Sequence, residues 1–164
     1  MNQNTKISRG VILIATPRIQ DSHFKNSVVL ILDHDEEGIL GLVLNRPSNI
    51  NCSQIVKTFD VKWSSRQNRL LIGGPVDSQS LWILHTDDYN FEHTQGLFNG
   101  VNLSRSEEAL TSLCNAKEDH IRLFLGYASW GAKQLEREIM EGSWWSSEAD
   151  ADLIFETQTD EIWH

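Results

Sequence analysis

Two histidines, His34 and His85, stand at the ends of predicted strands and are the residues best suited to proton transfer or metal binding. An imidazole titrates near neutral pH and also ligates metals, so either histidine beside a carboxylate such as Asp21 could act as an acid–base group. No spacing of the HxH or HExxH type supports a metal site. The alternative is that both imidazoles hydrogen-bond to backbone groups where the strands end.

A second set of residues could bind an anion. In the run Asn45-Arg46-Pro47, the guanidinium of Arg46 stands at a strand end, where it could hold a carboxylate or a phosphate by paired hydrogen bonds. Gly73 and Gly74 precede a proline and could bring backbone amides close to a ligand. Both features also have ordinary structural explanations, because a surface arginine and a glycine turn need no ligand.

Several catalytic and binding motifs are absent or incomplete. The chain has neither of the common glycine-rich loops that cradle phosphates. Residues 33–38 begin like a calcium-binding loop, but the twelfth position, which requires a bidentate glutamate, is Leu44. Ser129 follows a predicted strand as a hydrolase nucleophile does, but Tyr127 replaces the first glycine of the GxSxG pattern. We therefore expect no bound metal and no cofactor.

The 164 residues carry a formal net charge of −9, which restricts the classes of partner. Proteins that hold a phosphate backbone do so with Lys and Arg, so we expect no direct contact with nucleic acid. The apolar runs are far shorter than the roughly 20 residues that span a bilayer, and the polar start lacks a signal-peptide pattern. The two cysteines lie far apart in the sequence and form no CxxC pattern, so we expect both to be reduced thiols. We expect a cytoplasmic protein that does not bind membranes.

The acidic side chains are concentrated in the second part of the chain. Residues 101–164 hold thirteen Asp and Glu against five Lys and Arg, whereas residues 1–100 hold ten against nine. This imbalance indicates either a solvated acidic face or a docking surface for a basic protein partner.

The hydrophobic patterning predicts one α+β domain over residues 1–164, since a domain usually has about 100–200 residues. Short apolar runs bounded by Gly, Pro and Asp predict strands at 11–15, 26–33, 39–45, 69–73, 80–85, 121–127 and 153–156. Helical spacing predicts helices at 53–59, 104–114 and 130–140, with Ser104 and Ser129 as N-caps of the last two. Early hairpins followed by interspersed helices are typical of the α+β class.

A series of short motifs occurs in one order along residues 10–156. They are residues 12–17 (ILIATP), 27–29 (SVV) after Asp21 and Phe24, His34 with Gly38 and Gly41, 45–47 (NRP), 73–76 (GGPV), 84–85 (LH), 126–130 (GYASW) and 134–136 (QLE). Together these motifs resemble the YqgE/AlgH family of bacterial proteins.

The resemblance implies a fold and a compartment but no established reaction. It implies a compact α+β domain whose mixed, largely antiparallel sheet curls into a pseudo-barrel with helices packed outside, in a cytosolic protein. One branch of the family carries the label of a transcriptional regulator, although no DNA-binding motif belongs to the family pattern.

Two functions remain open, together with a purely structural role for the candidate residues. The first is a non-enzymatic regulatory protein that binds a small ligand or a partner's tail through Asp21, His34, Asn45, Arg46, Gly73, Gly74 and His85. The second is an enzyme of unassigned class that uses a cleft formed by His34, His85 and Asp21. The structural alternative is that these side chains hold strand ends and turns together.

Overall fold

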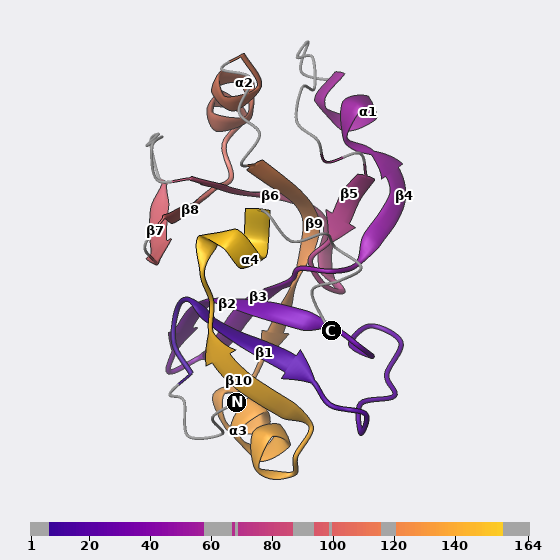
Figure 1. Cartoon of the computed structure of the whole chain (residues 1–164), viewed down its shortest axis with the longest axis vertical. Coiled ribbons are helices and arrows are strands. Elements are labelled where there is room, and N and C mark those ends of the chain that lie inside the picture. Colours follow the sequence, from indigo (N-terminus) through magenta and orange to yellow (C-terminus); the bar gives the residue numbers. More distant parts are fainter. Residues whose placement is uncertain are drawn as a thin grey trace.

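The computed structural model describes residues 7–57, 67, 69–86, 94–98, 100–115 and 121–155, which form an α+β fold (Figure 1). Its strands are β1 (Val11–Ala15), β2 (Val28–Asp35), β3 (Gly38–Val43), β4 (Pro47–Asn51), β5 (Arg69–Ile72), β6 (Val76–Thr86), β7 (Gln95–Phe98), β8 (Val101–Ser104), β9 (Ile121–Trp130) and β10 (Trp144–Glu148). Its helices are α1 (Cys52–Lys57), α2 (Glu107–Asn115), α3 (Ala132–Met140) and α4 (Ala151–Phe155). None of these helices is long and apolar enough to cross a bilayer.

The strands form one curled sheet with the order β10-β1-β2-β3-β9-β6-β8-β7, and β4 and β5 lie beside this path. Every described strand pair is antiparallel except β5 with β9. The curled, largely antiparallel sheet implied by the family resemblance is therefore confirmed. In Figure 1, α1 and α2 lie at one end of the molecule and α3 lies at the other.

Strand β9 connects the two halves of the sheet. Its first part pairs with β5 and β6, and its last residues, Ala128–Trp130, pair with β3. Gly126 lies where the register between β6 and β9 shifts, and it adopts a φ of 74°, a left-handed conformation that favours glycine. A Cβ on Gly126 would lie 2.5 Å from the carbonyl oxygen of Gly74, and one on Gly73 would lie 2.4 Å from the carbonyl oxygen of Gly126. The backbones approach too closely here for any side chain.

The core has three parts, which follow from the alternation of residues along the strands. The inner face of the curl holds the first cluster, to which α4 contributes Ile154 and Phe155. The second cluster lies under α3 around Leu135, and the third lies under α1 and α2. As the alternation in 80–85 predicts, Ile83 packs in the third cluster and Leu84 in the first.

The last predicted strand, 153–156, is wrong over its described residues, because Ala151–Phe155 form helix α4. The carboxylate of Asp150 accepts a hydrogen bond from the backbone N–H of Leu153 at 2.8 Å, as an N-cap does. Arg122 from β9 donates to the carbonyl oxygen of Phe155 at 2.6 Å. Asp150 thus satisfies a backbone N–H at the start of α4, and Arg122 satisfies a backbone carbonyl at its end. The short apolar run of this segment had indicated a strand.

Both predicted N-cap serines occupy other positions. Ser129 lies within β9, and α3 begins after Gly131 instead. Ser106 rather than Ser104 caps α2, because its hydroxyl oxygen accepts a hydrogen bond from the N–H of Ala109 at 3.1 Å. The sequence also left strands β4 and β10 unpredicted, since polar residues dominate both of them.

Replacing Gly126 with alanine tests the glycine contact between the halves of the sheet. The new Cβ would require a strained φ and would press on the Gly74 carbonyl, so Gly126→Ala should lower the free energy of unfolding by about 2–5 kcal/mol. Urea denaturation followed by circular dichroism measures this change.

Gly96→Ala is the matched control. Among the described residues, a Cβ there would meet only the Asn102 side chain, at 3.6 Å, so stability should change by less than about 0.5 kcal/mol. Equal effects of the two substitutions would show that the backbone approach at Gly126 is not a constraint.

Candidate functional site

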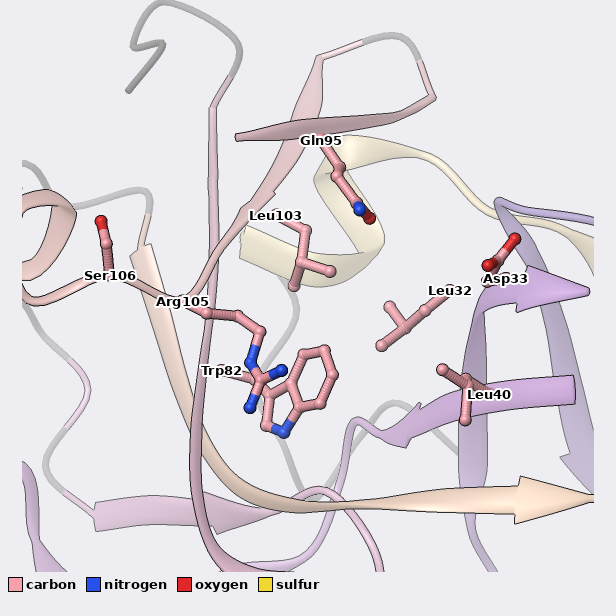
Figure 2. A pocket seen from close by; sticks show the side chains of 8 residues that line it. All are labelled: Leu32, Asp33, Leu40, Trp82, Gln95, Leu103, Arg105 and Ser106. Carbon is pink, nitrogen blue, oxygen red and sulfur yellow. The ribbon is translucent and has the colours of Figure 1, made fainter. Parts of the chain in front are cut away.

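A cavity of about 480 Å³ lies where the β2–β3 hairpin faces strands β6 and β8 (Figure 2). It is lined by Leu32, Asp33, Leu40, Trp82, Gln95, Leu103, Arg105 and Ser106. Leucines and a tryptophan make most of the wall, and a few polar groups lie at its rim. This volume and composition are typical of sites for small organic ligands.

The antiparallel register of β6 and β8 brings Trp82 and Arg105 together. Ile83 pairs with Ser104, so the next pair along the two chains is Trp82 with Arg105. The guanidinium carbon of Arg105 lies 4.0 Å from the centre of the Trp82 ring, which is a cation–π stack. Figure 2 shows the guanidinium over the indole, with Leu32 and Leu40 across the cavity.

Trp82 is held firmly in this arrangement. Its side chain is 6% exposed, and its Nε1–H donates to the Ser80 hydroxyl at 2.9 Å. The Tyr127 ring meets it edge-on at 5.5 Å between centroids. The indole is therefore a fixed platform for whatever lies above it.

Arg105 is exposed, and its guanidinium makes no hydrogen bond or ion pair with any residue that the structure describes. Stacking on Trp82 uses the face of the guanidinium and leaves its in-plane N–H groups free to donate. These donors lie at the rim of a cavity with apolar walls. Such a cation can recognise a carboxylate or a phosphate by paired hydrogen bonds.

The opposite side of the cavity carries Asp33, whose charge is partly offset. Its carboxylate lies 3.5 Å from an Arg9 guanidinium nitrogen and accepts a hydrogen bond from the His34 N–H at 3.0 Å. Arg9 also donates to the carbonyl oxygen of Gly96 in β7 at 3.3 Å. Arg9 thus links β2 to β7 at the far end of the sheet. At the rim of the cavity, Arg105 is a cation without an acidic partner in the described part of the chain.

None of the seven residues predicted from the sequence lines this cavity. Asn45 and Arg46 instead hold the segment 21–27. Asn45 accepts from the N–H of Val28 at 3.0 Å and donates to the carbonyl oxygen of Asn26 at 2.9 Å. Arg46 donates to the carbonyl oxygens of His23 and Lys25 at 3.2 and 2.9 Å. Both side chains hold this segment against the sheet through these hydrogen bonds.

Asp21 lies within the same segment, where its carboxylate accepts from the backbone N–H of His23 at 2.7 Å. The structure therefore brings Asp21, Asn45 and Arg46 into one region. The Nε of Arg46 is buried there without a hydrogen-bond partner. A ligand-binding role for these residues stays a prediction.

The two histidines lie apart from that region and have different partners. His34 is exposed, and its Nδ1 lies 2.8 Å from the carbonyl oxygen of Ile7. His85 is fully buried, with Nδ1 2.9 Å from the carbonyl oxygen of Thr86 and Nε2 2.7 Å from the hydroxyl of Ser104. Because a carbonyl only accepts, Nδ1 of His85 carries a proton and Nε2 accepts from Ser104 when the ring is neutral.

Gly73 and Gly74 pack their backbones against Gly126 and Tyr127. The Gly73 carbonyl accepts from the N–H of Val43 at 2.8 Å, and the Gly73 N–H donates to the Leu125 carbonyl at the same distance. Their close approach is therefore to another strand. Whether a ligand also reaches their amides stays a prediction.

Sequence reasoning missed Trp82 and Arg105 as a pair. The alternation along 80–85 places Trp82 on the inner face, but Arg105 lies inside the predicted capping segment and gives no signal of its own. Their contact depends on the register between β6 and β8, which only the folded sheet defines. Among the described residues, no group of three His, Cys, Asp or Glu side chains is placed to hold a metal ion.

The fold and the cavity define a small α+β protein with a curled sheet and a ligand-sized cavity between the sheet's two halves. Its sequence matches the profile of the AlgH-like family, DUF179, over residues 12–164, and the chain belongs to this family.

Proteins similar to this chain occur in several bacteria. A UPF0301 protein of Shewanella woodyi is 35% identical over 158 residues, covering 93% of this chain and 85% of that protein. One from Photobacterium profundum is 37% identical over 160 residues, covering 92% and 85%. The solution structure of AlgH from Pseudomonas aeruginosa has a TM-score of 0.74 at 28% identity, covering 94% of this chain and 85% of that chain.

A crystal structure of a protein from Corynebacterium diphtheriae has a TM-score of 0.79 at 24% identity, covering 99% of this chain and 86% of that chain. At this identity the likeness shows a shared fold. The names of these relatives state no activity.

Replacing Arg46 with methionine tests its structural role against ligand binding. The substitution keeps the aliphatic stem but leaves the carbonyls of His23 and Lys25 without their donor. Arg46→Met should lower the free energy of unfolding by about 1–2 kcal/mol, as urea denaturation would measure. Arg69→Met, at an exposed arginine of β5, should be nearly neutral. An Arg46→Met protein of unchanged stability would favour a ligand role for this guanidinium.

Proposed function

We propose that this chain is a non-enzymatic binding protein that takes a small organic ligand into the cavity between β2–β3 and β6–β8. The observation that carries the proposal is the Arg105 guanidinium held over the buried Trp82 at the rim of an apolar cavity. A fixed aromatic platform with a cation of unused donors offers both shape and charge to a ligand. We further propose that residues 1–164 act as one binding domain.

The titratable candidates lie outside the cavity lining, which supports binding over catalysis in this cavity. An acid–base mechanism would require His34, His85 and Asp21 to share one cleft. His34 and Asp21 make hydrogen bonds with different backbone groups, and His85 is buried against Ser104. None of the three lines the cavity. Binding in the cavity depends on Arg105 and Trp82 instead, and both of these residues line it.

We also propose that the protein is cytosolic and regulatory, and that it acts without direct contact to DNA. The formal net charge of −9 supports this, because a phosphate backbone would be repelled. A ligand that binds only the folded state would stabilise it and could shift its affinity for a protein partner. The label of transcriptional regulator in one branch of the family would then reflect an indirect effect.

A fragment screen by nitrogen–proton NMR tests the binding function. Fragments that enter the cavity should shift the indole Nε1–H of Trp82 and the amides of Leu103 and Arg105, because all three residues line it. The indole Nε1–H of Trp144, which donates to Glu138 at 2.9 Å on the other side of the sheet, is an internal control and should not move.

A variant that blocks the cavity makes this test specific. Gln95 is an exposed residue of the rim, so Gln95→Trp fills the space without disturbing the core and should abolish the shifts. Thermal unfolding would confirm that the variant is folded. Fragments that bind elsewhere, or that bind the blocked variant equally well, would contradict the proposed function.

A further inference from the structure

The charges at the rim of the cavity limit what the ligand can carry. Arg105 offers a guanidinium with no acidic partner among the described residues, which favours an anionic group on the ligand. Asp33 faces it across the cavity, and Arg9 offsets only part of the Asp33 charge because both side chains are about half exposed, at 45% and 50%. A second negative charge at the far end of the ligand would be repelled. The rim thus favours one negative charge.

The geometry of the donors favours a carboxylate over a phosphate. Among the described residues, the cavity lining contributes one guanidinium and no lysine, so a phosphate dianion would keep most of its charge unpaired there. A carboxylate matches a single planar guanidinium by two parallel hydrogen bonds. The hydroxyl of Ser106 caps helix α2 by accepting from the N–H of Ala109, and in Figure 2 it points away from the Arg105 guanidinium, so Arg105 is the donor that a carboxylate would meet.

The walls define the rest of the ligand. Leu32 and Leu103 are 2% and 4% exposed, and with Leu40 and the Trp82 ring they form an apolar surface beside Arg105. Burial of a hydrocarbon chain or ring against this surface is favourable, whereas a polar body would lose its water without replacement partners. The volume of about 480 Å³ suits a small molecule rather than a folded partner.

We infer that the ligand is a small monocarboxylic acid with an apolar aliphatic or aromatic body, its carboxylate on Arg105 and its body between Trp82 and the leucines of β2 and β3. This inference rests on the proposed binding function, since it names the ligand class of the same cavity. Specificity then depends on two residues. Arg105 attracts the negative charge of the carboxylate, and Asp33 repels a second negative charge on the ligand.

Calorimetric titration of the full-length chain with matched probes tests this inference. The probes are 3-phenylpropionate, its uncharged amide, the corresponding amine and phenyl phosphate. The acid should bind at least about tenfold more tightly than the amide, because the charge-assisted hydrogen bonds are lost in the amide. The amine should bind more weakly still, and the phosphate should bind more weakly than the acid.

Variants at the rim assign the effect to its residues. Arg105→Gln should weaken binding of the acid at least about tenfold and leave binding of the amide within about twofold. Arg69→Gln removes an exposed arginine that is not part of the cavity lining and should change neither affinity. Asp33→Asn keeps an oxygen that can accept from the His34 N–H, and it should improve binding of 3-(4-carboxyphenyl)propionate, which carries a second carboxylate at its far end, by about two- to fivefold while leaving 3-phenylpropionate within about twofold.

The outcomes separate this inference from the proposed function. Equal affinities for the acid and the amide, or an affinity for the acid that Arg105→Gln leaves unchanged, would overturn the inference of a monocarboxylic acid. The proposed binding function would still stand if fragments shifted the Trp82 signal. No shift at Trp82 with any probe or fragment would overturn both. A further probe is an acetylated tripeptide that ends in a free carboxylate. If it bound and the small acids did not, the ligand would be the tail of a protein partner, and the inference of a small acid would be overturned.

Discussion

The close packing of backbone at Gly126 is the constraint on which the architecture depends. Strand β9 pairs with β5 and β6 up to Leu125, with β6 again at Tyr127, and with β3 from Ala128 to Trp130, so one strand joins both halves of the sheet. The positive φ of Gly126 turns the strand, and the glycines Gly73 and Gly74 let a neighbouring segment approach the turn without side chains between them. A bulky residue at any of the three positions would force the halves apart.

The cavity follows from this turn in β9. Because the hairpin of β2 and β3 attaches to one part of β9 and the ribbon of β6 and β8 attaches to the other, their inner faces meet across the curl. Helix α4 fills part of the space with Ile154 and Phe155, and the rest stays open beside Trp82 and Arg105. The site is thus a product of sheet curvature, with its rim supplied by residues distant in sequence.

The sequence predicted the elements whose signals are local. The buried strands and the hairpin through Gly38 follow from short apolar runs and turn residues, and the curled sheet followed from the family resemblance. Helix α4 was predicted wrongly because its capping by Arg122 comes from another strand. The contact of Trp82 with Arg105 could not be predicted for the same kind of reason, since a strand register is a property of the folded chain. Asn45, which was singled out by its motif, makes hydrogen bonds to the segment before β2, and its ligand role stays a prediction.

A crystal structure of the chain grown with 3-phenylpropionate would test the account most directly. The account predicts the carboxylate within about 2.7–2.9 Å of two guanidinium nitrogens of Arg105, and the ring packed against Leu32 and Leu40 while Trp82 keeps its place. A molecule bound at Arg46, or one in the cavity with its carboxylate turned away from Arg105, would contradict it.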